Sequence, residues 1–335
     1  MKKVLLTSTI HPAAIAFLES NVDIIIAPNT SEDTLSTLAR KVDGMVARAS
    51  ARINRQIIET TENLCVISRT GAGVDNVDLT AAASKGIVVC SLPGMNALTV
   101  AEHAVTLILS LAKQLGLMDR SVREERWQAR TQYAPIDVCG KTLGLVGAGN
   151  IGSHVARICA EGLGMNVIAY DPLVSKQMQT TGYLHFVSDL PTIFRMSDFV
   201  SLHIPSSPAT HHLVNQQLLS TMKKTAYLVN TSRGDIVDES ALTCSLQQGR
   251  IAGAGLDVFQ QEPPLKSNPL LALPNVLFSP HSASLTGECV ERLATGAAQA
   301  VIDVLSGQMP LHIANENELR KAGSFPNLAP KNDAL

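Results

Sequence analysis

The sequence predicts an α/β protein built from two doubly wound parallel-sheet domains, and three features support this fold class. Short apolar runs alternate with helix-like segments along most of the 335 residues, which is the pattern of parallel βαβ units. The alternation stops at a polar stretch, residues 120–137, and restarts at Lys141. The chain length also suits two domains of ordinary size.

The first part of the chain contains apolar runs that fit strands, with helical patterns between them. The expected strands are residues 4–7, 22–27, 45–47, 65–68 and 87–90, and the expected helices are residues 13–19 and 32–41. A longer helix is expected over roughly residues 100–120. Thr99 and Glu102 at its start fit a capping box, in which both side chains satisfy free amides of the first turn.

The second part of the chain repeats the alternation. The expected strands are residues 143–146, 167–170, 199–203, 226–230, 253–256 and 276–279. A final long helix is expected over about residues 284–305, and a polar tail follows it.

Composition narrows the classes of function. Apolar residues make up 45% of the chain and charged residues 17%, which is typical of a globular protein. A net charge of -2 and an aromatic content of 4% give no reason to expect nucleic acid or an anionic membrane as the main partner. The apolar run after Lys3 is too short for a signal peptide. We therefore expect a soluble, cytoplasmic protein.

The six cysteines do not form a CxxC pair, and most of them stand in apolar surroundings. Buried free thiols are therefore expected, rather than a disulfide framework or a zinc site. No metal is predicted.

Gly147, Gly149 and Gly152 form a GxGxxG pattern between a predicted strand and an amphipathic helix. The next predicted strand ends at Asp171, 19 residues past the third glycine (171 − 152). A lone GxGxxG is weak support, and a glycine-rich turn that serves packing alone is the alternative. The strand–turn–helix–strand–acid order is, however, the pattern of a dinucleotide-binding unit.

Each part of this pattern has a physical reason. The first glycine permits a tight turn, the second lets the backbone approach a pyrophosphate, and the third lets the helix pack closely on the strand. The helix N-terminus offers free amides to the phosphates. Asp171 can accept both ribose hydroxyls of NAD and would repel the extra phosphate of NADP, so NAD is the expected cofactor. The residues expected to contact it here are Gly147, Gly149, Asn150, Ile151, Gly152 and Asp171.

Further motifs follow in a fixed order after the glycine turn. They are LHIP at residues 202–205, LVNTSRG at 228–234, GLDVF at 255–259, EP at 262–263 and SPH at 279–281. With these motifs the chain resembles the D-isomer-specific 2-hydroxyacid dehydrogenase family, from about residue 40 to 310. This family includes D-lactate, glycerate/hydroxypyruvate and 3-phosphoglycerate dehydrogenases.

The resemblance implies a catalytic set of Arg233, Glu262 and His281. Arginine presents a planar fork of donors that suits a substrate carboxylate and can polarise a neighbouring ketone. Histidine can exchange a proton with the substrate oxygen near neutral pH. A carboxylate beside the imidazole orients the ring and favours its protonated form.

The resemblance also implies other contacts. His203, Pro205 and Thr210 would lie beneath the adenosine, Asp257 would hold the nicotinamide side, and Thr99 could reach a cofactor phosphate. The implied cofactor-binding residues outside the glycine turn are Thr99, His203, Pro205, Thr210, Thr231 and Asp257, and the implied substrate-binding residues are Arg48, Ser50, Ala72, Gly73 and Arg233. For Arg48 and Ser50 a purely structural role stays open.

The family architecture implies a Rossmann cofactor domain, residues 98–287, inserted in a flavodoxin-like substrate domain, residues 1–97 plus 288–335. It also implies a homodimer. The expected reaction is reversible hydride transfer between NADH and C2 of a small 2-keto acid, giving a D-2-hydroxy acid. The alternative is a non-catalytic NAD(H)-sensing protein on the same scaffold.

The substrate itself stays open. Glu262 argues against formate oxidation, because formate dehydrogenases of this fold carry glutamine there. A phosphate or sulfonate on the substrate could be bound by some of the arginines, which could also be merely solvated: Arg48, Arg52, Arg126 and Arg130. A short, unbranched acid with a polar or anionic tail is expected.

Overall fold

In the computed structural model, which describes residues 1–174 and 180–330, the chain divides into two compact units. Unit 1 contains Met1–Asn96 together with the chain from Leu285 onward, and unit 2 contains Ala97–Ser284. Each unit has hydrophobic clusters of its own on both faces of a parallel sheet. The predicted fold class, α/β with two parallel sheets, is confirmed.

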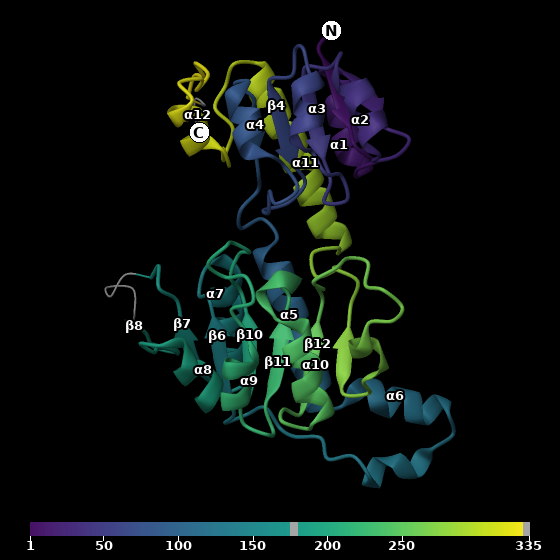
Figure 1. Ribbon diagram of the computed structural model, residues 1–335, viewed down its shortest axis with the longest axis vertical. Helices are drawn as coiled ribbons and strands as arrows, with labels where there is room; N and C mark the ends of the chain where they lie inside the picture. The colour runs from purple at the N-terminus through teal and green to yellow at the C-terminus, as the bar shows by residue number, and fades with distance from the viewer. Residues whose placement is uncertain (175–179, 331–335) are drawn as a thin grey trace. The chain divides into compact units, whose positions relative to one another are not determined.

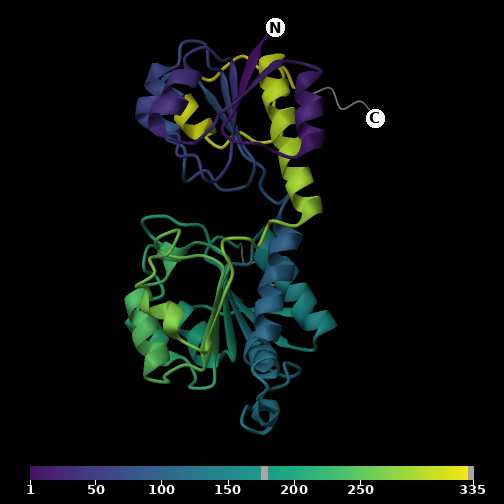
Figure 2. The same cartoon turned by 90° about the vertical axis from the view of Figure 1, so that its right-hand side faces the viewer.

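The sheet of unit 1 has the strand order β2-β1-β3-β4-β5, and all its strands are parallel. Helices α1 and α11 cover one face, and α2 and α3 cover the other (Figures 1 and 2). The strands are β1 (Lys3–Leu6), β2 (Asp23–Ile26), β3 (Gly44–Ala47), β4 (Val66–Arg69) and β5 (Val88–Cys90). The helices are α1 (Pro12–Glu19), α2 (Glu32–Ala39), α3 (Arg55–Thr60), α4 (Leu79–Ser84), α11 (Gly287–Leu305) and α12 (Glu316–Lys321).

Local sequence explains where these helices begin. Ser31, Asn54 and Asp78 are the N-cap residues of α2, α3 and α4, and each side chain accepts a hydrogen bond from an amide of the first turn. Such caps satisfy amides that have no partner inside the helix. Alternate residues of the strands enter opposite cores, as Leu5 and Leu6 do, because side chains of a strand point to opposite faces.

The sheet of unit 2 has the order β13-β12-β11-β10-β6-β7-β9-β8, in which only the short β8 is antiparallel to its neighbour. The strands are β6 (Thr142–Val146), β7 (Asn166–Tyr170), β8 (Thr180–Thr181), β9 (Leu184–Phe186), β10 (Phe199–Leu202), β11 (Tyr227–Asn230), β12 (Gly253–Leu256) and β13 (Val276–Phe278). Strand order reverses between β6 and β10, so the carboxyl ends of these strands form a topological switch point, where ligands of such sheets bind.

Helices α5 and α7 cover one face of this sheet, and α8, α9 and α10 cover the other (Figure 2). The helices are α5 (Ala97–Ala112), α6 (Leu115–Arg123), α7 (Asn150–Arg157), α8 (Leu190–Met196), α9 (Gln216–Thr221) and α10 (Glu239–Gln247). Shorter helical turns span Trp127–Thr131, Ile158–Gly162, Gly234–Ile236 and Pro269–Ala272.

Two expectations about the long helix are wrong. The helix expected over residues 100–120 is two helices, because Gln114 takes a left-handed backbone conformation with φ 49° and ends the first one. The capping box is also misplaced. Gly94, with φ 84°, lies in a turn over residues 93–96 that leads directly into α5 at Ala97, so Thr99 lies inside the first turn.

The expectation about the cysteines holds in part. All six are free thiols, but only Cys90, Cys159 and Cys289 are buried, whereas Cys65 and Cys139 are exposed. Among residues 1–174 and 180–330, no group of three or more His, Cys, Asp or Glu side chains could hold a metal ion. No helix in the same ranges is long and apolar enough to cross a membrane.

Candidate active site

The glycine turn joins β6 to α7 at the switch point of unit 2. Gly147 has φ 94°, and a Cβ atom there would lie 2.5 Å from the carbonyl oxygen of His203. A Cβ atom at Gly152 would collide with the carbonyl oxygen of Gly147. A Cβ atom at Gly149 would meet nothing within 4 Å. Backbone packing therefore demands the first and third glycines, and the space beside the second is open.

Helix α7 begins at this open space. Gly149 is its N-cap, and no side chain caps the helix. The first amides of the helix, including those of Asn150 and Ile151, belong to the end with positive dipole character. An uncapped N-terminus that follows a glycine turn suits an anionic phosphate.

Asp171 follows β7, the strand next to β6. Its carboxylate accepts one hydrogen bond from the amide of Ala148 in the glycine turn and one from the amide of Leu173, both at 2.9 Å. A carboxylate can accept about four hydrogen bonds. The acid is therefore fixed beside the turn and keeps capacity for two hydroxyl donors.

Two buried polar atoms at the ends of β10 and β11 have no hydrogen-bond partner among the described residues. They are Nδ1 of His203 and Oγ1 of Thr231. The other ring nitrogen of His203 lies 2.9 Å from the hydroxyl of Ser201, and burial of the ring lowers the pKa of His203 to about 4. Buried polar atoms are usually paired. These orphaned atoms, with the open glycine turn, fit a dinucleotide at this edge of the sheet.

The loop after β10 is held by hydrogen bonds between its own polar groups. The hydroxyl of Thr210 donates to the carbonyl of Pro205 at 2.8 Å and accepts from the amide of Ser207 at 2.8 Å. These bonds give Thr210 a visible role in holding the loop. Cofactor contacts of Pro205 and Thr210 stay predictions, as does the contact of Thr99.

Arg233 follows β11, and a close backbone approach fixes its surroundings. A Cβ atom at Gly234 would collide with the carbonyl group of Phe259, so only glycine lets the two chain segments come this near. The side chain of Asn230 donates to the carbonyl of Arg233 at 2.9 Å and shapes the turn. Arg233 is thereby held beside the segment that carries Glu262.

Glu262 and His281 form a pair, with Oε2 and Nδ1 2.7 Å apart. Partial burial pushes the pKa of Glu262 upward. The hydrogen bonds from His281 and the Phe259 amide, with the positive charges of His281 and Arg233, outweigh this and hold that pKa below its usual value. Glu262 is therefore an ionised acceptor at neutral pH. Because Nδ1 is engaged, Nε2 is the ring nitrogen left for proton exchange.

A cavity of about 430 Å³ adjoins this pair, with mostly apolar walls. The rings of Phe259 and Phe278 stack there, with their centroids 5.7 Å apart. The lining residues are Phe259, Glu262, Pro263, Pro264, Leu271, Phe278, Ser279, Pro280 and His281. An apolar neighbourhood strengthens the charge-assisted hydrogen bond between the two side chains.

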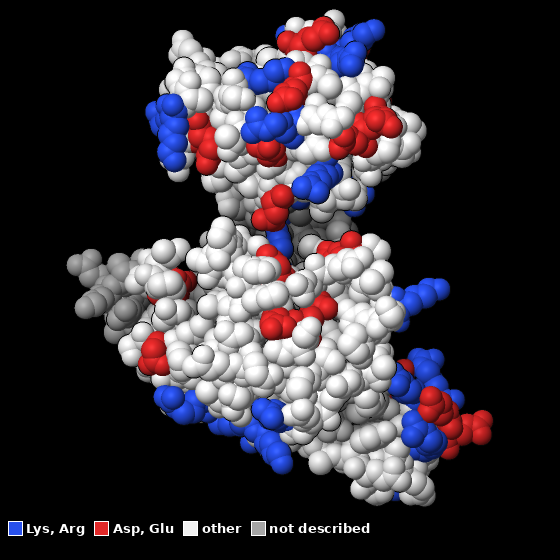
Figure 3. Space-filling view, viewed as in Figure 1, with Lys and Arg blue, Asp and Glu red and all other residues white. Residues whose placement is uncertain are grey.

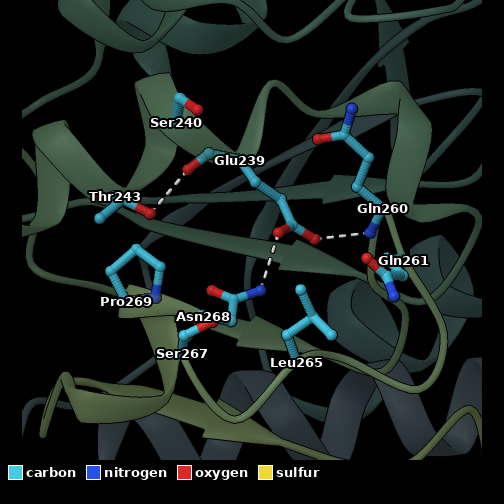
Figure 4. Close-up of a pocket in the computed structure, with 9 residues that line it drawn as sticks. All are labelled: Glu239, Ser240, Thr243, Gln260, Gln261, Leu265, Ser267, Asn268 and Pro269. Atoms are coloured by element: carbon cyan, nitrogen blue, oxygen red, sulfur yellow. Dashed lines mark hydrogen bonds between the residues drawn. The ribbon is translucent and has the colours of Figure 1, made fainter.

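A second cavity, of about 520 Å³, lies at the start of α10 and shows how the Glu262 segment is anchored (Figure 4). The carboxylate of Glu239 accepts from the Gln260 amide at 2.5 Å and from the Asn268 side chain at 3.0 Å. Both partners belong to the loop that follows β12. Glu239 therefore fastens the loop on which Glu262 stands.

Sequence reasoning missed Ser279 and His103, two residues near His281. Ser279 Oγ donates to the carboxylate of Asp257 at 2.6 Å. His103 on α5 lies 2.8 Å from the same hydroxyl. Nothing in the sequence around His103 or Ser279 indicates that these two side chains meet. The contact of Asp257 with the nicotinamide stays a prediction.

The expected substrate residues Arg48, Ser50, Ala72 and Gly73 all lie in unit 1, in the loops after β3 and β4. The two loops are tied together by Arg69, a residue 6% exposed. Its guanidinium donates to the carbonyl of Ala47 at 2.9 Å and to that of Gly73 at 3.1 Å.

The side chain of Asn76 adds a bond to the carbonyl of Arg48 at 3.2 Å. The substrate contacts themselves stay predictions. Arg126 and Arg130 belong to unit 2, on the segment around α6, where acidic and basic side chains gather together (Figure 3). Arg126 pairs with Glu124 at 2.6 Å, and Arg130 lies 5.8 Å from the ring centre of Trp127.

Comparison with known proteins shows the family of the chain. The family model for the NAD binding domain of D-isomer specific 2-hydroxyacid dehydrogenases matches residues 105–283. The chain is 36% identical over 315 residues to a D-3-phosphoglycerate dehydrogenase of Methanocaldococcus jannaschii, with 94% of this chain and 60% of that protein covered. It therefore spans about three fifths of that relative's length.

Two further proteins resemble the chain over nearly their whole length. A glyoxylate reductase of Korarchaeum cryptofilum is 34% identical over 326 residues, with 95% of this chain and 97% of that protein covered. The crystal structure of the TT0316 protein of Thermus thermophilus superposes with a TM-score of 0.85 at 33% identity, covering 93% of this chain and 99% of that chain.

Proposed function

Because the chain belongs to the D-isomer specific 2-hydroxyacid dehydrogenase family, we propose that it transfers a hydride reversibly between a nicotinamide cofactor and C2 of a small 2-keto acid. The observation that carries this proposal is the pair of Glu262 and His281 at 2.7 Å, held beside Arg233. Glu262 and His281 lie in the loops that follow β12 and β13, two strands of the sheet that also carries the glycine turn. Unit 2 would bind the cofactor.

The roles follow from the chemistry of each group. Arg233 binds the substrate carboxylate and polarises the ketone oxygen. A dihydronicotinamide, when bound, would supply the hydride to C2, and negative charge would then develop on the ketone oxygen. His281 gives a proton from Nε2 to the oxygen, and the charge of Glu262 stabilises the protonated ring until then. In the reverse direction His281 removes the proton of the 2-hydroxyl group.

NAD is the proposed cofactor, because an aspartate after the second strand of a dinucleotide-binding unit can accept the ribose hydroxyls and would repel a phosphate there, and Asp171 follows β7. A homodimer, which the resemblance implies, and a cytoplasmic location, which the sequence analysis expects, are part of the same proposal. A polar or anionic tail on the substrate is proposed as well.

The test is NADH oxidation with a panel of 2-keto acids: glyoxylate, pyruvate, hydroxypyruvate, 3-phosphohydroxypyruvate and 3-sulfopyruvate. Turnover by the wild type that is lost in His281→Ala supports the reaction class. The acid that is reduced best identifies the polar or anionic group on the substrate. Tight NADH binding without turnover on any acid would instead favour the NAD(H)-sensing alternative.

Replacing Asp171 by asparagine is expected to weaken NADH binding about tenfold and to reduce discrimination against NADPH. The amide keeps an oxygen for the Ala148 amide but loses the charge, and hydrogen bonds to charged groups contribute about 1.5–3 kcal/mol. Fluorescence titration of both cofactors measures this. Asp189→Asn, which changes an N-cap residue of α8, is the matched control. An unchanged ratio of the two affinities would remove Asp171 from cofactor selection.

Replacing Glu262 by glutamine is expected to shift the alkaline limb of the reduction profile to lower pH. The pKa of Glu262 is lowered, so its carboxylate is charged throughout the neutral range and favours the protonated form of His281. Without that charge the proton is lost at lower pH, and reduction falls off earlier. The pH dependence of kcat measures the limb, and a limb that stays in place contradicts the assigned role.

A further inference from the structure

The carboxylate of Asp257 organises the loop that carries His281. It is 1% exposed and follows β12. It accepts hydrogen bonds from the Ser279 hydroxyl at 2.6 Å, from the Ser282 amide at 2.9 Å and from the Ala283 amide at 3.0 Å. The carbonyl of the same residue accepts the His281 amide at 2.7 Å. One buried acid therefore holds four groups of the segment 279–283.

His103 extends this network to α5. Its Nε2 lies 2.8 Å from Oγ of Ser279 and 3.7 Å from Oδ1 of Asp257. A serine hydroxyl has one proton, and Ser279 gives it to the carboxylate. The serine oxygen must therefore accept from the histidine, which requires a proton on Nε2. The chain of donors runs from His103 through Ser279 to Asp257.

The backbone of His281 needs such support. Its φ is 50°, in the left-handed region that residues other than glycine seldom occupy. Hydrogen bonds from neighbouring groups must therefore hold the backbone of His281 in this conformation. The ring must also meet Glu262 at 2.7 Å, so a shift of the loop would weaken that pair.

The network also joins two segments at the ends of unit 2. His103 stands on α5, whose first residue, Ala97, begins the unit, and Ser279 and Ala283 directly precede Ser284, its last residue. The hydrogen bonds of His103, Ser279 and Asp257 thus link the first helix of unit 2 to its last segment.

We propose that His103 is a positioning residue for the reaction. Through Ser279 and Asp257 it holds the His281 loop in the geometry that pairing with Glu262 requires. This rests on the proposed function for its effect on turnover. The contact itself, a donor on Nε2 that fixes the loop, does not depend on that function.

The kinetic test compares His103→Leu with His103→Gln. Glutamine keeps an N–H donor at about the reach of Nε2, whereas leucine fills a similar volume without one. Leucine is expected to lower kcat roughly tenfold, since small misplacements of a catalytic group are costly, and glutamine to stay within about twofold of wild type. NADH affinity and the thermal midpoint are expected to be alike in the two variants. Equal impairment by both substitutions would overturn the proposal.

A double-mutant cycle tests whether His103 acts through Ser279. Ser279→Ala is expected to cost as much as His103→Leu, and the double variant is expected to cost no more than either, because both changes break one chain. Additive losses would overturn the proposed path through the serine.

A readout without turnover separates this proposal from the proposed function. In ¹⁵N-histidine spectra of the wild type, His103 is expected to carry a proton on Nε2. The ring signals of His281 are expected to shift in His103→Leu and to return in His103→Gln. Unshifted signals in the leucine variant overturn the positioning role, even if the wild type reduces none of the acids. Shifted signals support it in that case too.

Discussion

His281→Ala is expected to lower kcat for reduction by about 10²–10⁴-fold, with NADH affinity nearly unchanged. A positioned general acid contributes about that much to rate, and the alanine variant has no other group at the position of Nε2. The ring lies 42% exposed at the end of its loop, so its removal leaves no large cavity and the fold should persist. Stopped-flow hydride transfer from NADH, measured beside the thermal midpoint, gives the loss in the chemical step.

A matched control is His185→Ala, which removes an exposed histidine on β9 of the same unit. This variant should keep wild-type turnover. If His281→Ala also keeps turnover within a few fold, His281 is not the proton donor, and the pair with Glu262 serves structure only.

Arg233→Met is expected to lower kcat/KM by about 10²–10⁴-fold. Two charge-assisted hydrogen bonds of the guanidinium to the substrate carboxylate, at about 1.5–3 kcal/mol each, are lost together, and each 1.4 kcal/mol corresponds to about tenfold. The kcat/KM of Arg233→Lys should lie between those of the wild type and Arg233→Met, since an ammonium keeps the charge but not the planar fork. Steady-state kinetics on the best acid of the panel measure both variants.

Arg123→Lys is the control, because Arg123 is an exposed residue of α6 that pairs with Asp119 at 2.9 Å. Inhibition by a simple monocarboxylate separates binding from chemistry. If that inhibitor binds Arg233→Met as tightly as wild type, Arg233 does not anchor the carboxylate, and another group must do so.

Much of the fold followed from local patterns. The strand before Gly147 and the helix after it were predictable because strand and helix periods differ and because a turn with φ 94° demands glycine. The break between α5 and α6 was not predictable, because Gln114 has no intrinsic preference for its left-handed conformation. The start of α5 was misjudged because Thr99 and Glu102 match a cap by type, whereas the preceding turn decides where the helix begins.

The sequence by itself determined which residue types follow three strands of one sheet: Asp171 after β7, Arg233 after β11, and His281 after β13. Parallel strands end at one edge of a sheet, so these groups had to share that edge once the fold class was known. Only the tertiary structure decided their partners. Donors and acceptors far apart in the chain meet according to strand order and loop packing, and local periodicity carries no information about either. That is why the pairing of His281 with Glu262 could be expected only from a resemblance, and why the contact from His103 through Ser279 to Asp257 was not foreseen at all.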